Sequence, residues 1–253
     1  LFSTNGSQQA ENTKNENPNR YIFPKQVLAM TQIEESENIV FFGGAGVSTA
    51  SGIPDFRSST GLYHKYPYRA EVMLSHTYFM HHTEEFFQFY FQEMIHKEAK
   101  PNACHKKLVE LENCGKLKRV VTQNIDGLHQ MAGSKHVLEL HGTVLKNTCM
   151  KCHRKYSLEE IEKCHICSCG GVIKPDVVLY EEPLPDGVYE KAIDAITKCD
   201  TLIVGGTSLA VYPASHLVDF FHGKNLVVVN KDTTSLDERA TLVIHDDIAK
   251  VFA

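Results

Sequence analysis

The chain has 253 residues, of which 42% are hydrophobic and 23% are charged, and these are ordinary proportions for a globular protein. Its net charge of -5 provides no overall basic field to hold nucleic acid or an anionic membrane surface. No apolar run approaches the roughly 20 residues that span a bilayer, so we expect no transmembrane segment.

The first twenty residues are polar and rich in asparagine, and they lack the apolar segment of a signal peptide. We therefore expect residues 1–20 to form a disordered arm. Regular patterning begins near Tyr21. Apolar residues at helical spacing between Val27 and Ile33 predict a first helix.

Strand and helix patterns alternate along the rest of the chain. Short apolar runs predict strands at residues 38–42, 119–122, 137–140, 177–180, 201–204 and 226–229. Helical spacing predicts helices over 84–98, 105–112 and 188–198. The first of these helices is rich in aromatic residues, which we expect to pack in a core. This alternation is typical of a parallel sheet covered by helices on both faces.

A glycine-rich loop follows the first of these strands. Gly44 and Gly46 would let backbone N–H groups approach a pyrophosphate at the start of a helix. The dinucleotide fingerprint is incomplete, because Thr49 replaces its third glycine and no acidic residue follows about 20 positions on. Beyond it, Arg57 would clamp a phosphate and Phe56 would cover a flat ring. The loop therefore contains more side chains suited to ligand binding than a purely structural turn requires.

Polar side chains also follow the other strands where they end. Residues 122–126 contain two amides and a carboxylate, which suit a carboxamide and a ribose. His141 follows the next strand and is a candidate general base. Hydroxyls at 207–208 and the amide of Asn230 follow two later strands. Because open α/β sheets bind ligands beyond the carboxyl ends of their strands, we expect one site along this edge.

Five of the eight cysteines lie between Cys149 and Cys169. Cys149 and Cys152 form one close pair, and Cys164, Cys167 and Cys169 follow, a spacing typical of a four-thiolate zinc knuckle. Disulfides are disfavoured, because no secretory signal is seen and three other cysteines are scattered. Four thiolates leave no open position for water, so we expect one structural Zn²⁺. We prefer Cys167 with Cys169 as the second pair, and Cys164 with Cys167 stays an alternative.

Taken together, these motifs resemble those of the sirtuin (Sir2) family, in its bacterial branch. The motifs lie at residues 44–57, 122–126, 141–142, 149–152, 164–169, 174–178, 206–208 and 229–230, and the resemblance covers about residues 21–252. It implies an α/β fold, a Rossmann-like doubly wound parallel sheet with a smaller zinc-binding plus helical domain. It assigns 21–60, 101–145 and 175–253 to the NAD-binding domain, and 61–100 and 146–174 to the small domain.

The resemblance implies an NAD-dependent protein-lysine deacylase. In that reaction the acyl-lysine oxygen attacks C1′ of the nicotinamide ribose, and the products are nicotinamide, free lysine and O-acyl-ADP-ribose. His141 would be the general base. The cofactor would be held by Ala45, Thr49, Phe56, Arg57, Gln123, Asn124, Ile125, Asp126, Thr207, Ser208, Asn230 and Ile248. An acylated peptide would pair as an added strand with Val177, Val178 and Leu179.

Three other classes of function compete with this interpretation. An NAD-dependent ADP-ribosyltransferase would use the same cofactor site, but transfer to a protein does not need the base His141. An NAD oxidoreductase is opposed by the missing acidic residue and by the cysteine pairs. A zinc-ribbon nucleic-acid binder is opposed by the negative net charge.

The acyl group and the cellular location are further predictions. In some sirtuins a Tyr-x-x-Arg pair reads acidic acyl groups, and Tyr66 and Arg69 have that spacing here. We expect Arg69 to be solvated, which favours acetyl and other uncharged acyl groups. The cysteine usage predicts a reducing compartment, the cytoplasm.

Overall fold

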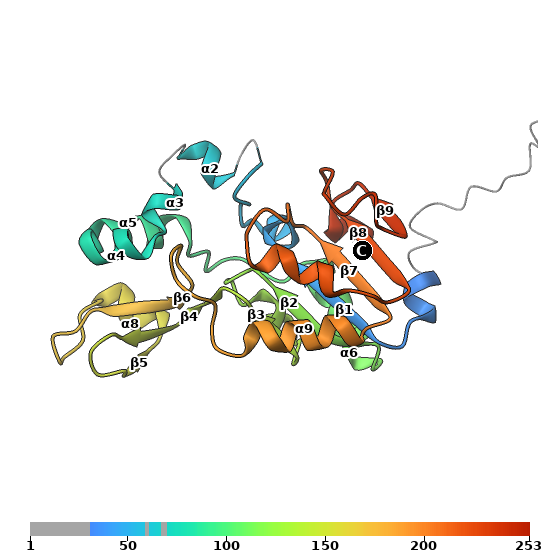
Figure 1. Ribbon diagram of the computed structural model, residues 1–253. Helices are drawn as coiled ribbons and strands as arrows, with labels where there is room; N and C mark the ends of the chain where they lie inside the picture. Colours follow the sequence, from blue (N-terminus) through green and yellow to red (C-terminus); the bar gives the residue numbers. More distant parts are fainter. Residues whose placement is uncertain (1–30, 59–60, 67–69) are drawn as a thin grey trace, which may run out of the picture.

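The computed structural model describes residues 31–58, 61–66 and 70–253. A large part built on a six-stranded sheet lies beside a smaller part of helices and a three-stranded sheet (Figure 1). The arm expected at residues 1–20, most of the first predicted helix and Arg69 lie outside the described residues. Within the described ranges, no helix is long and apolar enough to cross a membrane.

The large sheet is parallel throughout. Its strands are β1 (Ile39–Gly43), β2 (Leu117–Thr122), β3 (Val137–Glu139), β7 (Thr201–Gly205), β8 (Asn225–Val229) and β9 (Leu242–Ile244). They lie in the order β3-β2-β1-β7-β8-β9, so the winding reverses between β1 and β7. This confirms the predicted doubly wound sheet, and such a switch point is where open α/β sheets bind ligands.

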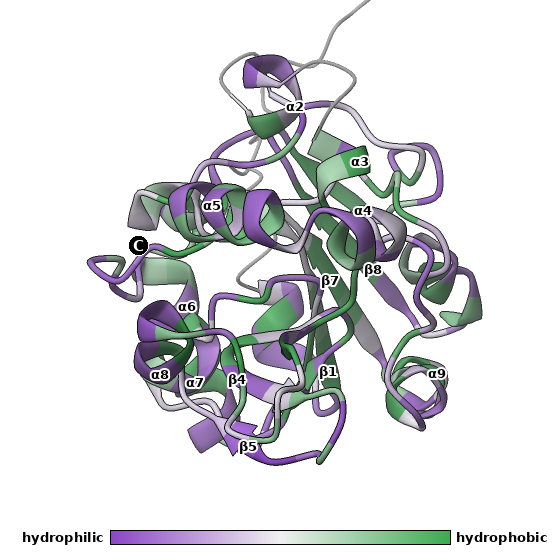
Figure 2. Cartoon of the chain, turned by 90° about the vertical axis from the view of Figure 1, so that its left-hand side faces the viewer, coloured by the Kyte–Doolittle hydropathy of each residue, from purple (hydrophilic) through white to green (hydrophobic). Residues whose placement is uncertain are grey.

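Helices cover both faces of this sheet. They are α6 (Ala103–Asn113), α7 (Leu128–Ala132), α9 (Val188–Lys198) and α10 (Ile248–Val251), with the 3-10 helices η1 (Ala45–Val47), η2 (Thr49–Ser51) and η3 (Ala214–Phe220). Successive side chains of a strand point to opposite faces. Phe41 of β1 therefore packs with α6 and α10, while Phe42 packs with α9 and η3. Hydropathy colouring shows the central strands β1 and β7 as largely hydrophobic (Figure 2).

The smaller part combines short helices with an antiparallel sheet. It contains α2 (Leu62–Lys65), α3 (Ala70–Met73), α4 (His76–His81), α5 (Thr83–Glu93), α8 (Leu158–Lys163), β4 (Gly142–Cys149), β5 (Lys155–Tyr156) and β6 (Ile173–Val177). The central strand β4 pairs with β5 and with β6. The aromatic residues of α5 pack in this core, as predicted. The domain limits given above stay predictions.

Two predicted elements have different limits in the structure. The helix expected over 84–98 ends at Glu93, because Met94 and Ile95, whose spacing extended the predicted helix, pack against the core of the smaller part from the turn that follows. The strand expected at 177–180 is instead β6, which ends at Val177. Beyond it, the Val178 N–H donates to the carbonyl of His141 (2.8 Å) and the Tyr180 N–H to that of Leu74 (3.0 Å). Beyond Val177 the segment therefore runs from the start of β4 to the turn after α3, and it does not continue as a strand.

Candidate active site

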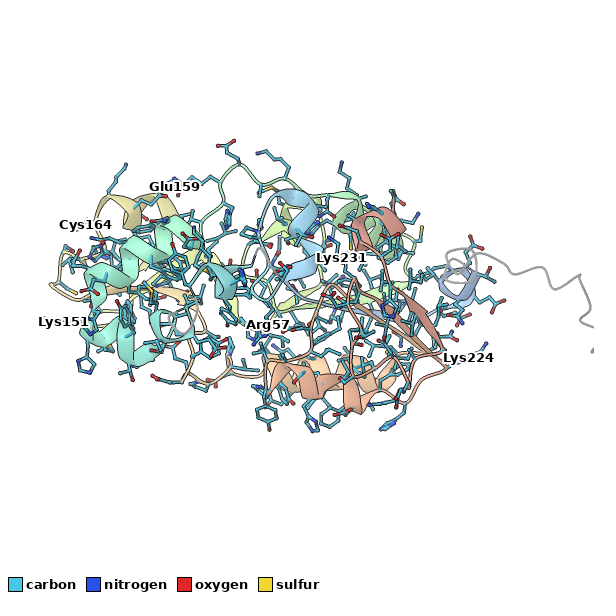
Figure 3. All side chains as sticks on the ribbon, turned by 90° about the horizontal axis from the view of Figure 1, so that it is seen from above. Arg57, Lys151, Glu159, Cys164, Lys224 and Lys231 are labelled. Atoms are coloured by element: carbon cyan, nitrogen blue, oxygen red, sulfur yellow. The ribbon has the colours of Figure 1, made fainter. Side chains whose placement is uncertain are left out.

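A cavity of about 1320 Å³ lies at the carboxyl edge of the large sheet and reaches the smaller part. The loops after β1, β2, β7 and β8 line it, together with residues of α5 and of the segment after β6. Its volume exceeds the roughly 300–1,000 Å³ of ordinary small-molecule sites. A dinucleotide and a substrate side chain would therefore fit in it together. Arg57, which lines the cavity, lies near the middle of the molecule between the two parts (Figure 3).

The glycines after β1 bring two loops together at the switch point. The Gly46 N–H donates to the carbonyl of Gly206 at 2.8 Å. A Cβ added to Gly46 would lie 2.7 Å from Cα of Gly206, and one added to Gly44 would lie 2.8 Å from Cβ of Thr207. Only glycine allows this approach of one backbone to another. The result is a narrow cradle of main chain, which suits a pyrophosphate group.

Side-chain hydrogen bonds join the loops after β1, β2 and β7. Gln123 donates from Nε2 to Oγ1 of Thr207 (3.0 Å), and Asn124 donates from Nδ2 to Oγ of Ser48 (3.0 Å). The Ser48 hydroxyl in turn donates to Oδ2 of Asp126 (2.7 Å). Sequence reasoning missed Ser48, although a hydroxyl directly after a glycine loop was a usable signal. These bonds fix the orientation of the two amides before any ligand arrives.

His141 has the geometry of a general base. Its Nδ1 lies 2.9 Å from the carbonyl oxygen of Gln123. Because a carbonyl can only accept, Nδ1 carries the proton and Nε2 keeps its lone pair. Burial lowers the pKa of His141 below its ordinary value, and the bond to Gln123 offsets only part of that effect. The imidazole is therefore neutral near pH 7 and able to accept a proton.

The other residues predicted for cofactor or substrate also line the cavity. They are Ala45, Thr49, Phe56, Arg57, Ile125, Asp126, Val177, Val178, Leu179, Ser208, Asn230 and Ile248, with Gln123, Asn124 and Thr207 described above. The Arg57 guanidinium lies 5.0 Å from the ring centroid of Tyr63 and 3.8 Å from a carboxylate oxygen of Glu71. Their placement is compatible with the predicted roles, which stay predictions.

The segment expected to pair with a peptide already uses most of its N–H groups. Glu182 accepts the Leu179 N–H at 2.9 Å, and its other oxygen lies 2.7 Å from Nδ1 of His76 in α4. The hydroxyls of Tyr63 and Tyr180 also bond to each other, joining α2 to this segment. An added strand would pair with the remaining carbonyl groups of the segment or displace the Glu182 carboxylate.

Four cysteine sulfurs gather in the smaller part. Those of Cys149, Cys152, Cys167 and Cys169 all lie within 4.8 Å of one another. Cys149 and Cys169 are 3.5 Å apart and Cys152 and Cys167 are 3.6 Å apart, close to the ~3.8 Å edge of a tetrahedral zinc–thiolate site. These distances far exceed the ~2 Å of a disulfide. The donor set therefore fits a structural Zn²⁺ and matches the preferred prediction.

The fifth cysteine of this region stays outside the cluster. Cys164 is exposed, and its sulfur lies 3.4 Å from the carbonyl oxygen of Ile166. Cys164 and Lys151 lie at one end of the molecule, well away from Arg57 (Figure 3). The cysteine cluster is thus remote from this part of the cavity, as expected of a structural site.

A doubly wound sheet with a cavity at its switch point is the architecture of nucleotide-binding enzymes. The cysteine cluster, the incomplete glycine fingerprint and the partly buried, neutral His141 set this chain apart from plain dehydrogenases. The chain belongs to the Sir2 family, whose family model matches residues 44–213. This confirms the resemblance seen in the motifs.

Relatives and solved structures agree with the family. The chain is 56% identical to an NAD-dependent protein deacetylase of Clostridium acetobutylicum, over 87% of this chain and 93% of that protein. It is 57% identical to one of Clostridium perfringens, with the same coverage. A Sir2 structure with a deacetylated p53 peptide and 3′-O-acetyl ADP-ribose has a TM-score of 0.85 at 38% identity, covering 90% of this chain and 96% of that chain. A Sir2 structure with a p53 peptide and NAD⁺ has a TM-score of 0.79 at 38% identity, covering 89% and 94%.

Proposed function

We propose that this protein is an NAD-dependent protein-lysine deacetylase that acts on acetylated and other uncharged acylated lysines. The observation that carries the proposal is the His141 imidazole, which is neutral, partly buried and protonated at Nδ1, in the same cavity as the glycine cradle. The names and bound products of the relatives support the same activity.

The cavity offers groups for each portion of NAD. We assign the pyrophosphate region to Ala45, Thr49 and Arg57, the nicotinamide side to Phe56, Gln123, Asn124, Ile125 and Asp126, and the adenosine half to Thr207, Ser208, Asn230 and Ile248. When bound, NAD supplies an electrophilic ribose carbon with nicotinamide as its leaving group. The amides of Gln123 and Asn124, fixed by Thr207 and Ser48, would orient the ribose next to that bond. Such fixed orientation lowers the entropic part of the barrier.

In this reaction His141 would be the general base. Its Nε2 accepts the proton of a ribose hydroxyl, which prepares that oxygen to attack the acyl carbon. The bond from Nδ1 to Gln123 holds the ring in the required tautomer throughout. One water molecule is consumed, since its oxygen completes the products, and the released products are free lysine, nicotinamide and O-acyl-ADP-ribose. The competing function, transfer of ADP-ribose to a protein, does not need a base at the position of His141.

The acylated peptide would lie along the segment from Val177 to Leu179, as a strand added mainly through backbone groups. We propose that Zn²⁺ on Cys149, Cys152, Cys167 and Cys169 holds the end of the small domain together and takes no part in the reaction. We also propose the cytoplasm as the working compartment, because thiolate ligands need reducing conditions.

The test is to incubate the protein with an acetyl-lysine peptide, with and without NAD, and to follow the peptide by mass spectrometry. We expect deacetylated peptide only in the presence of NAD. The same peptide with the acetyl group on a serine ester is the control for a contaminating esterase. Absence of an NAD-dependent product with acetyl, propionyl and butyryl peptides would overturn the proposal.

A further inference from the structure

The loop that carries two residues proposed for the pyrophosphate region, Ala45 and Thr49, is built from two very short helices. The 3-10 helices η1 and η2 have three residues each, and among the described residues neither has a side-chain hydrogen bond at its N-cap. Helices of this type have poorer hydrogen-bond geometry than α-helices, so such short ones depend on contacts with neighbouring elements. The loop therefore needs support from outside to keep its shape before NAD binds.

Asn102, the N-cap of α6, bonds to both short helices. Its Nδ2 donates to the carbonyl oxygen of Val47 at 2.8 Å and to the hydroxyl oxygen of Ser51 at 2.9 Å. These two partners lie on either side of Ser48, the residue at which η1 ends and η2 begins. Because an amide NH2 group carries two hydrogens, one side chain makes both bonds at once. Asn102 thus joins the two short helices to each other and to α6.

The rest of the Asn102 residue is fixed as well. Its Oδ1 accepts the Cys104 N–H at 3.0 Å, and its own N–H donates to Nδ1 of His105 at 3.3 Å. This reciprocal pattern is a capping box, which satisfies N–H groups at the first turn of a helix. Cys104 and His105 are both fully buried. The amide is therefore held in the orientation that points its NH2 group toward the loop.

Asn102 lies where the chain enters the large part. The chain leaves the smaller part after α5 and crosses to α6 (Figure 1). On the way it lines the cavity with His96, Lys97 and Ala99. Asn102 itself is not among the residues that line the cavity in the described ranges. It is therefore placed to act on NAD through the loop and not by touching the cofactor.

The turn between η1 and η2 is also held from the cavity. Ser48 is 1% exposed, and its hydroxyl bonds to Nδ2 of Asn124 (3.0 Å) and to Oδ2 of Asp126 (2.7 Å). Those bonds use the side chain of Ser48, whereas Asn102 bonds to the residues on either side of it from outside the cavity. Loss of the Asn102 bonds would therefore leave the turn fixed on one side only.

We propose that Asn102 is a positioning residue for NAD, which holds η1 and η2 in the shape that the pyrophosphate region requires. Its effect on turnover rests on the proposed deacylase function, whereas its effect on the loop and on binding of the adenosine diphosphate part of NAD does not. A loop that is ordered in advance costs less entropy when the ligand binds. Without the two bonds from Asn102, NAD itself has to order the loop. Affinity then falls, while the chemistry of the bound complex is unchanged.

The test needs a variant that keeps the helix cap and loses the two bonds to the loop. Asn102→Ser is that variant, because serine caps a helix about as well as asparagine, carries no charge and lacks the NH2 group. Ser51→Ala removes one of the two bonds and leaves α6 unchanged. Ser157→Ala is the matched control, because Ser157 caps α8 in the smaller part and has no bond to the cofactor loop among the described residues.

Three measurements are made on each protein: amide hydrogen exchange over residues 45–53, calorimetric affinity for ADP-ribose, and steady-state kinetics with NAD and an acetyl-lysine peptide. In Asn102→Ser we expect faster exchange over 45–53, about tenfold weaker binding of ADP-ribose and about tenfold higher KM for NAD. kcat at saturating NAD, KM for the peptide and the melting temperature should match the wild type. Ser51→Ala should show smaller changes of the same kind, and Ser157→Ala should show none of them.

A folded Asn102→Ser with wild-type exchange over residues 45–53 and wild-type affinity for ADP-ribose would overturn the inference, because Asn102 would then only cap α6. If Asn102→Ser does not fold, Ser51→Ala decides the same question, and wild-type values of both quantities in that variant would overturn it too. A wild-type protein that binds ADP-ribose but does not deacetylate the peptide would instead overturn the proposed function and leave this inference in place.

Discussion

The cavity and the cysteine cluster are built on opposite principles. In the cavity, polar groups come from strand ends far apart in sequence, and Nε2 of His141 makes no hydrogen bond among the described residues. In the cluster, four sulfurs close in sequence face one another and leave no position open. Free atoms held in place are what a reaction needs, whereas a closed donor set only holds a fold. The most conspicuous sequence feature is therefore the scaffold, and the chemistry depends on scattered residues.

The largest effect should come from removing the free nitrogen in the cavity. We expect His141→Ala to lower kcat by about 10²–10⁴-fold, because no other group at that position accepts the proton. Zinc content and the far-ultraviolet circular dichroism spectrum should match the wild type. Near-normal deacetylation by this variant would assign the base to another residue. It would also contradict the view that the reaction depends on the free nitrogen of His141.

Replacing a cysteine of the cluster should instead lower the bound zinc and the stability of the protein, and should affect catalysis only through the loss of folded protein. Cys152→Ser is expected to lower bound zinc from one per chain toward zero and to cost several kcal/mol of stability. Cys164→Ser, the matched control, should keep its zinc because Cys164 lies outside the cluster. Metal analysis and thermal unfolding would measure both. A zinc-free Cys164→Ser would show that the alternative ligand pair is the true one.

Acid should weaken the large part through two buried histidines. Burial lowers the pKa of His105 to about 4 and that of His129 to about 3, and their ring centroids are only 4.7 Å apart. Both are neutral in the folded protein, whereas the unfolded chain binds protons below about pH 6.5. Stability is therefore complete above that pH and falls as the pH drops toward 4 and then 3.

Proton binding by these two histidines in the unfolded chain should lower the free energy of unfolding by about 2–4 kcal/mol when the pH falls from 7 to 5. Chemical denaturation at both pH values, with bound zinc measured in parallel, separates this loss from any loss of metal in the smaller part. His129→Leu should flatten the pH dependence. An unchanged slope in that variant would mean that the histidines do not titrate on unfolding as described.

The smallest effect concerns the stability of the cavity wall. Tyr90→Phe removes a buried hydroxyl that has no partner in the described part of the chain, so the usual penalty of about 1–3 kcal/mol for an unsatisfied group disappears. We expect a melting temperature equal to or above that of the wild type. A clear loss of stability would show that the hydroxyl is bonded in solution.

Sequence patterns predicted much of the fold because its elements follow simple periodicity. The helix α9 covers the predicted residues, and the buried strands around Phe42 and Val204 are within a residue or two of prediction. Polar residues such as Gln123 and His141 could be located because parallel strands bring their carboxyl ends to one edge. The sheet of the smaller part was not predicted, since β4 and β5 carry exposed residues that break the alternation and the strand expected at 177–180 shares only Val177 with β6.

The cavity end near α5 could not be predicted from the pattern. The spacing of aromatic residues shows which face of that helix is buried, and it correctly indicates a core. It does not show that Tyr90 and Glu93 reach a cavity, because this depends on Lys65 and Tyr66 arriving from another helix. Ser48 was missed for a similar reason, since its partners Asn124 and Asp126 lie on a separate strand end.

The measurement that tests the central claim most directly is the stoichiometry of the reaction. With an acetyl-lysine peptide and NAD, the amounts of NAD consumed, nicotinamide released, peptide deacetylated and O-acetyl-ADP-ribose formed should be equal. Deacetylation that consumes no NAD would contradict the account. So would NAD cleavage that attaches ADP-ribose to protein and leaves the acetyl group in place.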